Sequence, residues 1–475
     1  MSSEKGKFYI TTSIAYTNAP PHLGFALELV QADVLARYQR ILGEKVFFLT
    51  GTDEHGQKIV KAAEEADRTP KEFTDELSEK FKKLKEPLGI SNDDFIRTTD
   101  QKRHWPTVKD IWFKLKENGD IYKKRYKGLY CVGCEAFITQ KDLAGGKCKI
   151  HQKEPEIIEE ENYFFRLSKY SKEIGETVKE NKVKIIPDGR KNEMLNFIDQ
   201  GLEDVSFSRP RKDLKWGIPV PDDNSQIVYV WADALINYLS ALGYPDGGNF
   251  KKYWPADIHC VGKDILRFHA TIWLGILLSL KLPLPENIFV HGFITSNSQK
   301  MSKSLGNVVD PFELVKKYGT DPVRYFLLRE ITPTEDGDFT YEKFEQRYNS
   351  DLAKGLGNLL ARVVTLSDKY DISSKSKASQ QTQKEIDIAQ KKYKKALKEF
   401  KFNEALVAVW EFISLCDEYI EKEKPWEGEK KEVVENLLLA LKEIAKLLEP
   451  FLPQTSEEII RQIKSKKNKS LFPRI

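Results

Sequence analysis

Residues 8–42 read FYITTSIAYTNAPPHLGFALELVQADVLARYQRIL, and this stretch predicts a strand, a turn and a helix in succession. Residues 8–16 are rich in aromatic and β-branched side chains, which is typical of a buried strand, while residues 26–42 carry apolar side chains at helical spacing. His22 therefore lies in the turn, where backbone N–H groups and the positive end of a helix dipole favour an anion. Gly24 would let a flat ligand approach the backbone closely. Taken alone, a turn histidine beside two prolines is more often a capping or surface residue.

The bulk composition describes a globular protein of several domains. Its 475 residues are 40% hydrophobic, which is enough to bury a large core. The 76 basic and 72 acidic residues leave a formal net charge of +4. Because the chain has no global polybasic character, any surface that binds nucleic acid must be local.

The sequence contains no evident signal for export or for a membrane span. The N-terminal MSSEKGKFYI lacks the apolar core of a signal peptide, and the most apolar run, residues 268–280, is too short to cross a bilayer. Five cysteines, three of them close together, suit a reducing compartment and a metal site better than a disulfide framework. We therefore expect a cytoplasmic protein with no membrane partner.

Strand-like and helical segments alternate along much of the chain. Strand-like runs at 8–14 and 45–50 are followed by three more at 226–232, 257–262 and 287–294, with helical patterns between them. This alternation predicts an α/β fold with a parallel sheet.

Two regions depart from this alternation and complete the predicted domain organisation. The region from about 119 to 225 contains short strands and turns, so we interpret it as an insertion between two halves of one nucleotide-binding fold of the Rossmann type. Towards the C-terminus, apolar side chains recur every three or four positions among Lys and Glu, which predicts an α-helical bundle. The predicted domains are a first catalytic half at 1–118, an insertion at 119–225, a second half at 226–350 and a helical domain at 351–475.

A cysteine cluster in the insertion has the spacing of a zinc knuckle. The stretch CVGCEAFITQKDLAGGKCKIH supplies Cys131, Cys134, Cys148 and His151 in a C-x2-C-x13-C-x2-H pattern. Three thiolates and one imidazole can occupy the four tetrahedral positions around Zn²⁺. Because four protein ligands leave no open position, we predict a structural rather than a catalytic zinc. The other two cysteines, one in a predicted strand and one in a predicted helix, are expected in the core.

A cationic loop lies late in the α/β part of the chain. Residues 300–307 read KMSKSLGN, with two lysines three positions apart, serines beside them and a glycine after them. Such a loop can close over a polyphosphate. Because Lys/Ser loops are common on surfaces, this one taken alone favours a solvated loop.

The turn and the loop together resemble the paired signatures of the class I aminoacyl-tRNA synthetases, since PHLGF follows the first predicted strand and KMSKS follows the last one. The resemblance implies that His22, Lys300 and Lys303 are catalytic and bind ATP. His22 would meet the phosphates, and the lysines would stabilise charge on the α-phosphate and the leaving pyrophosphate. The same resemblance places Gly24 under the adenine, makes Asp264 a ribose contact, and implies Mg²⁺ with the ATP.

Four further blocks narrow the resemblance to the methionyl-tRNA synthetases. FLTGTDEHG (48–56), YVWADALINYL (229–239), GKDILRFHATIW (262–273) and VHGFITSNSQKMSKSLGN (290–307) stand in the order of that family and at roughly its intervals. The resemblance runs from about residue 7 to 350 and continues more weakly to the C-terminus. It implies a split Rossmann catalytic domain that activates L-methionine with ATP and transfers the methionyl group to tRNA(Met).

Apolar side chains in these blocks predict a pocket for the amino acid. Three between residues 231 and 238 are spaced to share one face of a helix, and three between 265 and 273 share another. Taken alone, such stripes are more often core, but the resemblance implies that they surround the methionine thioether, with Leu235 where the family often has proline. The methionine-binding residues implied by the resemblance are Ile14, Tyr16, Asp53, Trp231, Leu235, Tyr238, Ile265, His269 and Trp273.

Two polar residues are assigned to the substrate by the same resemblance. Asp53, in GTDEHG, would hold the ammonium group, the alternative being that it caps the following helix. Arg209, in SFSRP, would reach towards the substrate carboxylate, the alternative being a structural ion pair.

Phe25 departs from the family signature, which usually ends in a second histidine. A phenyl ring cannot donate a hydrogen bond to phosphate or ribose, so either another residue supplies this hydrogen bond or the enzyme lacks it. Loss of one such donor would lower the rate by on the order of a hundredfold. Because His22, Gly24 and both signature lysines are present, we expect an active enzyme with an altered ATP site.

The helical domain contains three candidates for reading an anticodon. Single-stranded bases are read by stacking and by hydrogen bonds to their edges. Asn358 and Arg362, four residues apart in GNLLAR, and Trp426 in KPWE match family positions with this role. Taken alone, an isolated Asn or Trp is more often structural.

Two alternative functions remain open from the sequence. A sister class I synthetase for isoleucine, valine or leucine would need an editing domain for which the insertion lacks room, and a closed zinc site argues against selection of cysteine by metal. The other alternative is a catalytically weak protein that binds tRNA or methionine, in which Phe25 reflects the loss of a catalytic histidine. Because no appended oligomerisation module is evident, we expect a monomer.

Overall fold

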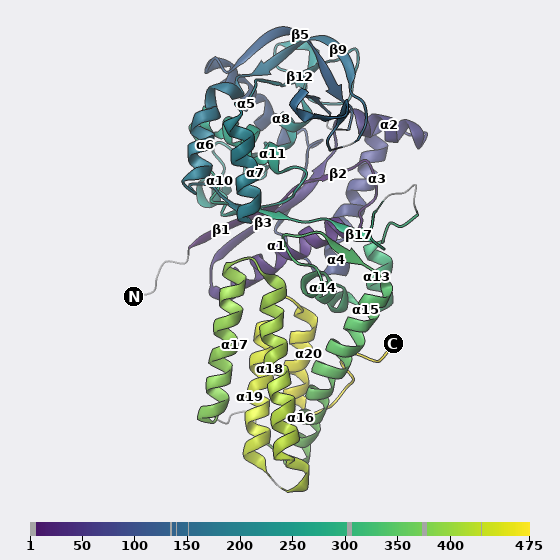
Figure 1. The fold of residues 1–475 in the computed structure, drawn as a ribbon, viewed down its shortest axis with the longest axis vertical. Coiled ribbons are helices and arrows are strands. Elements are labelled where there is room, and N and C mark those ends of the chain that lie inside the picture. Colours follow the sequence, from purple (N-terminus) through teal and green to yellow (C-terminus); the bar gives the residue numbers. More distant parts are fainter. Residues whose placement is uncertain are drawn as a thin grey trace. The chain divides into compact units, whose positions relative to one another are not determined.

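The structure is a computed structural model that describes residues 6–133, 135–138, 140–150, 152–301, 306–372, 378–428 and 430–475 (Figure 1). The chain divides into two compact units. The first unit consists of Met1–Pro21, Leu42–Lys83 and Asn92–Val290, and the second consists of His22–Ile41, Leu84–Ser91 and His291–Ile475. Each unit therefore combines segments that are distant in the sequence.

A seven-stranded sheet runs through the first unit in the order β10-β16-β15-β1-β3-β2, with β4 also paired to β3. The pairings of β1 with β15 and β3, of β3 with β2 and β4, and of β10 with β16 are all parallel. The predicted parallel α/β sheet is therefore confirmed. The strands are β1 (Lys7–Thr12), β2 (Ala15–Tyr16), β3 (Lys45–Asp53), β4 (Asp94–Arg97), β10 (Lys184–Ile186), β15 (Ile258–Gly262) and β16 (Asn287–His291).

The strands pair in this way because they are apolar on both faces. Successive side chains of a strand point to opposite faces, yet Tyr9 and Ile10 in β1 and Phe48 and Leu49 in β3 are all fully buried. Helices therefore have to cover the sheet. Those of the first unit are α2 (Gln57–Glu65), α3 (Pro70–Lys83), α5 (His104–Glu117), α6 (Ser171–Lys179), α7 (Asp188–Asp199), α8 (Val230–Ala234), α9 (Asn237–Ser240), α10 (Gly248–Tyr253), α11 (Leu266–Phe268) and α12 (Leu274–Ser279), with the 3-10 helices η1 (Gln140–Asp142) and η2 (Leu167–Tyr170) and the π-helix η3 (His269–Trp273).

The order of the strands reverses between β1 and β15. After β1 the chain continues to β2 and β3 on one side, whereas after β15 it continues to β16 on the other. In open α/β sheets, ligands bind outside the carboxyl ends of the strands at such a switch point. The ends of β1 and β15 are therefore the first place in this unit to look for a site.

Antiparallel strands interrupt the parallel sheet in the middle of the chain. One sheet has the order β11-β9-β5-β6, and in it β5 and β9 pair from Ile121↔Phe165 to Tyr130↔Glu156. A smaller sheet has the order β12-β14-β13, and β7 pairs with β8. The strand β10 lies in the same stretch of sequence but belongs to the main sheet. The interrupting strands are β5 (Ile121–Cys131), β6 (Ala136–Ile138), β7 (Leu143–Ala144), β8 (Lys147–Cys148), β9 (Glu156–Phe165), β11 (Val205–Ser206), β12 (Ser208–Pro210), β13 (Pro219–Val220) and β14 (Asp223–Val228).

The expectation that residues 226–232 form a strand of the parallel sheet is wrong. The apolar run belongs to β14, which pairs antiparallel with β12 and β13, and Tyr229 then leads directly into α8. A short apolar run cannot distinguish a parallel strand from a hairpin strand, because both are buried in the same way.

The two predicted helical stripes are also interrupted. Trp231 lies in α8 and Tyr238 in α9, with Leu235 at the break between them. Ile265 precedes α11, and His269 begins the π-helix η3, in which hydrogen bonds span five residues rather than four. The spacing therefore identified positions that lie in or against the core, but not the helix geometry that carries them.

The second unit is mainly helical. Its C-terminal part is a bundle in which α16, α17, α18, α19 and α20 pack side by side (Figure 1), which confirms the predicted helical domain. A small sheet of the order β18-β17-β19 accompanies the helices. The elements are α1 (Leu23–Leu42), α4 (Lys85–Leu88), β17 (Ile294–Ser296), β18 (Gln299–Lys300), α13 (Pro311–Tyr318), α14 (Thr320–Arg329), β19 (Gly337–Phe339), α15 (Tyr341–Arg347), the π-helix η5 (Tyr348–Gly357), α16 (Asn358–Lys369), α17 (Gln380–Lys398), α18 (Phe402–Glu423), the 3-10 helix η6 (Pro425–Glu427), α19 (Lys431–Leu448) and α20 (Pro453–Ser465).

A buried ion pair joins the segments of the second unit. Arg324 of α14 and Asp33 of α1 are both fully buried, and the Nη2 atom of Arg324 lies 2.8 Å from the Asp33 carboxylate. Arg324 also donates to the backbone oxygens of Leu88, Pro450 and Phe451. Burial raises the pKa of the Asp33 carboxyl, but the nearby guanidinium groups and hydrogen bonds outweigh it and the net pKa is lowered. The pair is therefore ionised at neutral pH.

No helix in the described part of the chain is long and apolar enough to cross a membrane.

Candidate active site

The carboxyl end of β3 presents a buried acid with an unused acceptor. Asp53 is 7% exposed, and its Oδ1 atom has no hydrogen-bond partner within the described part of the protein. Burial, together with the negative charge of Asp233 and Glu135, raises the pKa of Asp53 well above its ordinary value. Capping of α2 is not its role, because Gly56 occupies the N-cap position. A buried carboxyl with one oxygen left without a partner suits a cationic group of a ligand.

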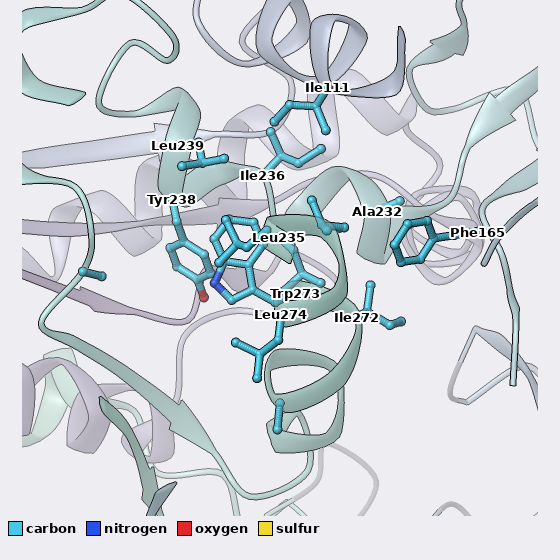
Figure 2. Close-up of a cluster of buried hydrophobic side chains, with 14 of the residues drawn as sticks. Ile111, Phe165, Ala232, Leu235, Ile236, Tyr238, Leu239, Ile272, Trp273 and Leu274 are labelled. Carbon is cyan, nitrogen blue, oxygen red and sulfur yellow. The ribbon is translucent and has the colours of Figure 1, made fainter. Parts of the chain in front are cut away.

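The predicted pocket residues divide into a half-buried layer and a fully buried layer. Four of them are half-buried and pack on the edge of the core, namely Ile14, Tyr16, Trp231 and Ile265. The other four are at most 1% exposed, namely Leu235, Tyr238, His269 and Trp273. Figure 2 shows Leu235, Tyr238 and Trp273 within the buried cluster. Only the half-buried layer offers surface to a ligand, so the buried layer supports it from behind.

Phe268, which helical spacing did not predict, also belongs to the half-buried layer. Its ring stacks on Trp231 with the centroids 3.9 Å apart and an interplanar angle of 9°. Stacked rings of this kind form a flat apolar wall. The signal was available, because Phe268 lies within the same sequence block as Ile265 and His269, but the assumed regular helix placed it on another face.

His269 is a neutral supporting residue in the buried layer. Burial lowers its pKa to about 4, although a hydrogen bond to the Ile265 carbonyl opposes the shift. Its Nδ1 atom lies 3.0 Å from that carbonyl oxygen and its Nε2 atom lies 2.7 Å from the hydroxyl of Tyr238. In the neutral ring, Nδ1–H therefore donates to Ile265 and Nε2 accepts from Tyr238. This arrangement fixes Ile265 relative to Tyr238.

Glu135 is a second residue of the site that was not predicted from the sequence. Its buried carboxylate accepts a hydrogen bond of 2.8 Å from the hydroxyl of Tyr16 and one of 3.0 Å from the backbone N–H of Lys58 in α2. The Lys58 ammonium in turn donates to the Gly133 carbonyl. The turn that follows Cys131 is therefore held against Tyr16 and the start of α2. The sequence carried no periodic signal for this contact, because it joins residues that are 119 positions apart.

A buried histidine–aspartate–histidine cluster supports the same region. The Asp233 carboxylate accepts from His55 Nδ1 at 2.6 Å and from His104 Nε2 at 2.7 Å, and His104 Nδ1 lies 2.8 Å from the Ser240 hydroxyl. Burial raises the pKa of Asp233, but the two imidazoles outweigh it and the net pKa is lowered. Because Asp233 lies in α8 and His55 follows Asp53 by two residues, this cluster positions Trp231 relative to Asp53.

Arg209 is 7% exposed and is held by protein groups. Its guanidinium donates to Ser206, to the Ser208 carbonyl and to the Glu135 carbonyl, and it lies 4.5 Å from the ring centroid of Tyr229. Its Nε atom is buried and has no hydrogen-bond partner among the described residues. The guanidinium therefore holds neighbouring strands together and keeps one donor unused.

In the second unit, His22 adopts a defined tautomer at the start of α1. Its Nδ1 atom accepts a hydrogen bond of 3.0 Å from the backbone N–H of Gly24. Neighbouring protein atoms desolvate the ring and lower the pKa of His22, although part of the ring is accessible. The imidazole is therefore neutral at pH 7, with its proton on Nε2, and Nε2–H is the group left to donate to a ligand.

Gly24 is required for this arrangement. A Cβ atom at position 24 would come within 2.9 Å of Cε1 and 3.0 Å of Nδ1 of the His22 ring. The next residue, Phe25, is half-buried in the first turn of α1, and its N–H donates to the His22 carbonyl. The glycine therefore orients the histidine instead of merely providing flexibility.

The other predicted nucleotide-binding residues are less fully described. The backbone of Lys300 belongs to β18 and pairs with Thr295 of β17, while Lys303 lies outside the described residues. Asp264 is exposed and follows the carboxyl end of β15, at the switch point of the sheet.

Two of the four predicted zinc ligands are described, and they lie together. Cys131 and Cys148 are 2% and 1% exposed and belong to one small buried cluster. Cys134 and His151 lie outside the described residues. Among the side chains that are described, no group of three or more His, Cys, Asp or Glu is arranged to hold a metal. The remaining cysteines, Cys260 in β15 and Cys416 in α18, are buried as expected.

The three predicted anticodon residues lie in or beside the helical bundle. Arg362 of α16 stands over the ring of Trp426, 5.3 Å from its centroid, and its Nη2 atom lies 2.8 Å from the Glu421 carboxylate. Trp426 is 40% exposed in η6, and Asn358 is exposed at the start of α16. The structure therefore brings Arg362 and Trp426 together, with Asn358 on the same helix one turn away.

Comparison with known families identifies both regions of the chain. The family described as "tRNA synthetases class I (M)" matches residues 8–146 and 134–364, and the family described as "Anticodon-binding domain of tRNA ligase" matches residues 379–473.

Individual relatives agree with the family matches. The methionine–tRNA ligase of Thermotoga maritima is 46% identical over 96% of this chain and 75% of its own length, and that of Bacillus subtilis is 44% identical over 98% and 74%. The solved structure of Mycobacterium tuberculosis methionyl-tRNA synthetase in complex with methionyl-adenylate is similar to this chain with a TM-score of 0.92 at 35% identity. That similarity covers 99% of this chain and 100% of the solved one.

The geometry of His22 leads to a test at Gly24. Because Gly24 does not have a positive φ, we expect Gly24→Ala to fold normally and to displace the His22 ring, which breaks the hydrogen bond to Nδ1. A donor to Nδ1 favours the neutral ring, so its loss raises the pKa of His22. Titration of the seven histidines by NMR measures this shift.

Gly189→Ala is the matched control, since a Cβ there meets no atom within 4 Å. An unchanged His22 titration in Gly24→Ala would show that Gly24 does not orient the ring.

Proposed function

This chain belongs to the methionyl-tRNA synthetase family of class I, and from this premise we propose how its own residues carry out the reaction. The family membership rests on matches that cover most of the chain. The chain therefore catalyses the ATP-dependent attachment of methionine to tRNA. The alternatives of a sister class I enzyme and of a non-catalytic binding protein are set aside, because the relatives described above are ligases for methionine.

The first step joins methionine to the α-phosphate of ATP. A carboxylate oxygen of methionine attacks the α-phosphorus, a new P–O bond forms, and the bond to pyrophosphate breaks with its electron pair. No protein nucleophile is needed, so the contribution of the protein is positioning and electrostatic stabilisation. Mg²⁺ bound with the ATP neutralises charge on the phosphates.

Asp53 is the proposed contact of the methionine ammonium group. The observation that carries this role is the buried Oδ1 atom without a partner, together with the raised pKa of the carboxyl. An arriving ammonium group supplies the missing partner and favours the ionised carboxylate. Binding therefore lowers the raised pKa of Asp53.

The methionine side chain is proposed to lie against the half-buried layer of Ile14, Tyr16, Trp231 and Ile265, with Phe268 behind Trp231. A thioether makes favourable contacts with aromatic rings, worth roughly 0.3–1.5 kcal/mol each. Leu235, Tyr238, His269 and Trp273 are proposed to act on methionine through this layer, because their own side chains are fully buried.

The nucleotide is proposed to meet the signature residues of the second unit. The neutral His22 donates from Nε2–H to a phosphate oxygen, and Gly24 leaves room for the adenine. Lys300 and Lys303 are proposed to stabilise charge on the α-phosphate and pyrophosphate, and Asp264 to accept from a ribose hydroxyl. Phe25 contributes packing in α1 and no hydrogen bond from its side chain.

Zinc is proposed to stabilise the turn that carries Glu135. The close burial of Cys131 and Cys148 fits a thiolate site, and Cys134 and His151 are proposed to complete it. Zinc in such a closed site supplies structural stability and takes no part in the chemistry.

The anticodon of the tRNA is proposed to be recognised by the helical bundle. Trp426 would stack on an anticodon base, while Asn358 and Arg362 would donate to base edges, as single-stranded RNA recognition requires.

The domain boundaries predicted from the sequence, at 1–118, 119–225, 226–350 and 351–475, remain proposals. A monomer acting in the cytoplasm also remains a prediction, which light scattering and localisation of the tagged protein would test.

The activity is tested by ATP–pyrophosphate exchange with methionine, isoleucine, leucine, valine and cysteine in parallel. We expect exchange with methionine alone, because the rings of Tyr16 and Trp231 make contacts with a thioether that a branched aliphatic side chain does not reproduce. The absence of exchange with every amino acid, in folded protein with Mg²⁺, would contradict the proposed chemistry and make Phe25→His the next variant.

The role of Asp53 predicts a pH-dependent affinity for methionine. Because the pKa of Asp53 is raised, the carboxyl becomes protonated as the pH falls from neutral, and the KM for methionine in the exchange assay should rise. Asp53→Asn should weaken binding by about ten- to a hundredfold, since a charge-assisted hydrogen bond contributes roughly 1.5–3 kcal/mol, and should remove the pH dependence.

Asp264→Asn is the matched control, because it should change the KM for ATP and leave that for methionine. A methionine KM that keeps its pH dependence in Asp53→Asn would refute the assignment of Asp53.

The zinc proposal predicts that Cys148→Ser lowers both bound zinc and thermal stability. Metal content is measured by atomic absorption and stability by the melting temperature. Cys260→Ser is the control, since Cys260 is buried to the same extent but lies outside the cluster. Unchanged zinc content in Cys148→Ser would exclude the knuckle.

A further inference from the structure

Two acids follow one another at the carboxyl end of β3 and have opposite surroundings. Asp53 has a buried Oδ1 atom for which the described part of the protein supplies no hydrogen-bond partner. Glu54 is fully buried, and each of its four polar atoms, N, O, Oε1 and Oε2, makes a hydrogen bond within the protein. Because Glu54 has neither surface nor an unused oxygen, it is not a contact of the substrate.

Arg97, the last residue of β4, binds the Glu54 carboxylate with two parallel hydrogen bonds. Its Nε atom lies 2.7 Å from Oε1 and its Nη2 atom lies 2.8 Å from Oε2. The Thr52 hydroxyl donates to Oε1 at 2.6 Å, and the Thr99 hydroxyl donates to Oε2. Burial lowers the pKa of Arg97, but its hydrogen bonds to Glu54 and Asp75 outweigh it and the net pKa is raised. Arg97 therefore stays charged and keeps the Glu54 carboxylate in one orientation.

The peptide group that joins Asp53 to Glu54 is held from both sides. The Asp53 carbonyl accepts hydrogen bonds of 3.0 Å from the backbone N–H and from the hydroxyl of Thr17. The Glu54 N–H donates to the Thr98 hydroxyl at 2.9 Å, and the Glu54 carbonyl accepts from the Trp216 indole at 2.5 Å. Because a peptide group is planar, these contacts fix the backbone from which the Asp53 side chain projects.

The strands β3 and β4 also approach each other closely at this end. Gly51 is paired with Ile96, and a Cβ atom at position 51 would lie 2.1 Å from the Ile96 carbonyl oxygen. In the same register, Arg97 stands opposite Thr52. The strand pairing therefore sets the backbone position from which Arg97 reaches the Glu54 carboxylate.

We propose that the ion pair of Arg97 and Glu54 positions Asp53, so that the unused oxygen of Asp53 faces the ammonium group of methionine. The proposal rests on the proposed function, because it takes Asp53 as the contact of that group. Arg97 and Glu54 are positioning residues, since both act through Asp53, and they set the affinity for methionine rather than for ATP. An acid that is held in its binding orientation beforehand loses less free energy on ordering when the substrate binds.

Substitution of Arg97 in two backgrounds tests the proposal. The KM values for methionine and ATP and the kcat of ATP–pyrophosphate exchange are measured for the wild-type protein, Arg97→Lys, Asp53→Asn and the double variant. Lysine keeps the charge but cannot make two parallel hydrogen bonds. We expect Arg97→Lys to raise the KM for methionine by about tenfold and to change the KM for ATP and kcat by less than about twofold. In the Asp53→Asn background, the same substitution should leave the KM for methionine unchanged, because the acid that Arg97 positions is gone.

Arg103→Lys is the matched control. Arg103 is also partly exposed and also pairs with a carboxylate, but its partner is Asp94 rather than Glu54. The control should therefore leave both KM values unchanged. Thr99→Val keeps the proposal testable if Arg97→Lys does not fold, because it removes one donor to the Glu54 carboxylate at nearly constant volume. It should also raise the KM for methionine and leave that for ATP.

The two possible failures are distinguishable. A methionine KM that is unchanged in folded Arg97→Lys, or that rises equally when Asp53 is already replaced, would overturn the positioning role. Parallel changes in the KM for ATP and in kcat would do the same, because they would show a general structural effect. A methionine KM that Asp53→Asn leaves unchanged would instead overturn the assignment of Asp53 in the proposed function.

Discussion

The buried ion pair between Arg324 and Asp33 is the constraint on which the second unit depends. Removing two charges from water costs several kcal/mol per ion, and the attraction between them offsets this only when the remaining hydrogen bonds are satisfied. Arg324 meets that condition by donating to three backbone carbonyls, and Asp33 by accepting from Ser91 and Arg37. The pair therefore fixes α1 against segments that are distant in sequence. Because His22 directly precedes α1, a charge in the middle of this helix fixes where the signature histidine before its first turn can be.

The first unit is under a different constraint. Its proposed pocket must keep apolar surface exposed and charged groups without partners until a substrate binds. Half-buried rings such as Trp231 would be free to move if nothing supported them. The buried layer provides this support through directional bonds, from Ile265 through His269 to Tyr238 and from His55 through Asp233 to His104. A site whose contacts are held in place before binding loses less free energy on ordering when the substrate binds. The half-buried layer can therefore be small, because the larger buried layer orients its side chains.

The features predictable from sequence were those that depend on local pattern. The strand–turn–helix of residues 8–42, the helical bundle and the order of the signature blocks all follow from periodicity or from motifs with characteristic residues. The role of β14, the break at Leu235 and the π-helix at His269 were not predictable in this way, because a buried apolar run has the same composition in each geometry. Glu135 was not predictable because its contact with Tyr16 joins residues that are 119 positions apart. Phe268 was missed because a regular helix would place it on another face, although it lies in the same block as Ile265 and stacks on Trp231.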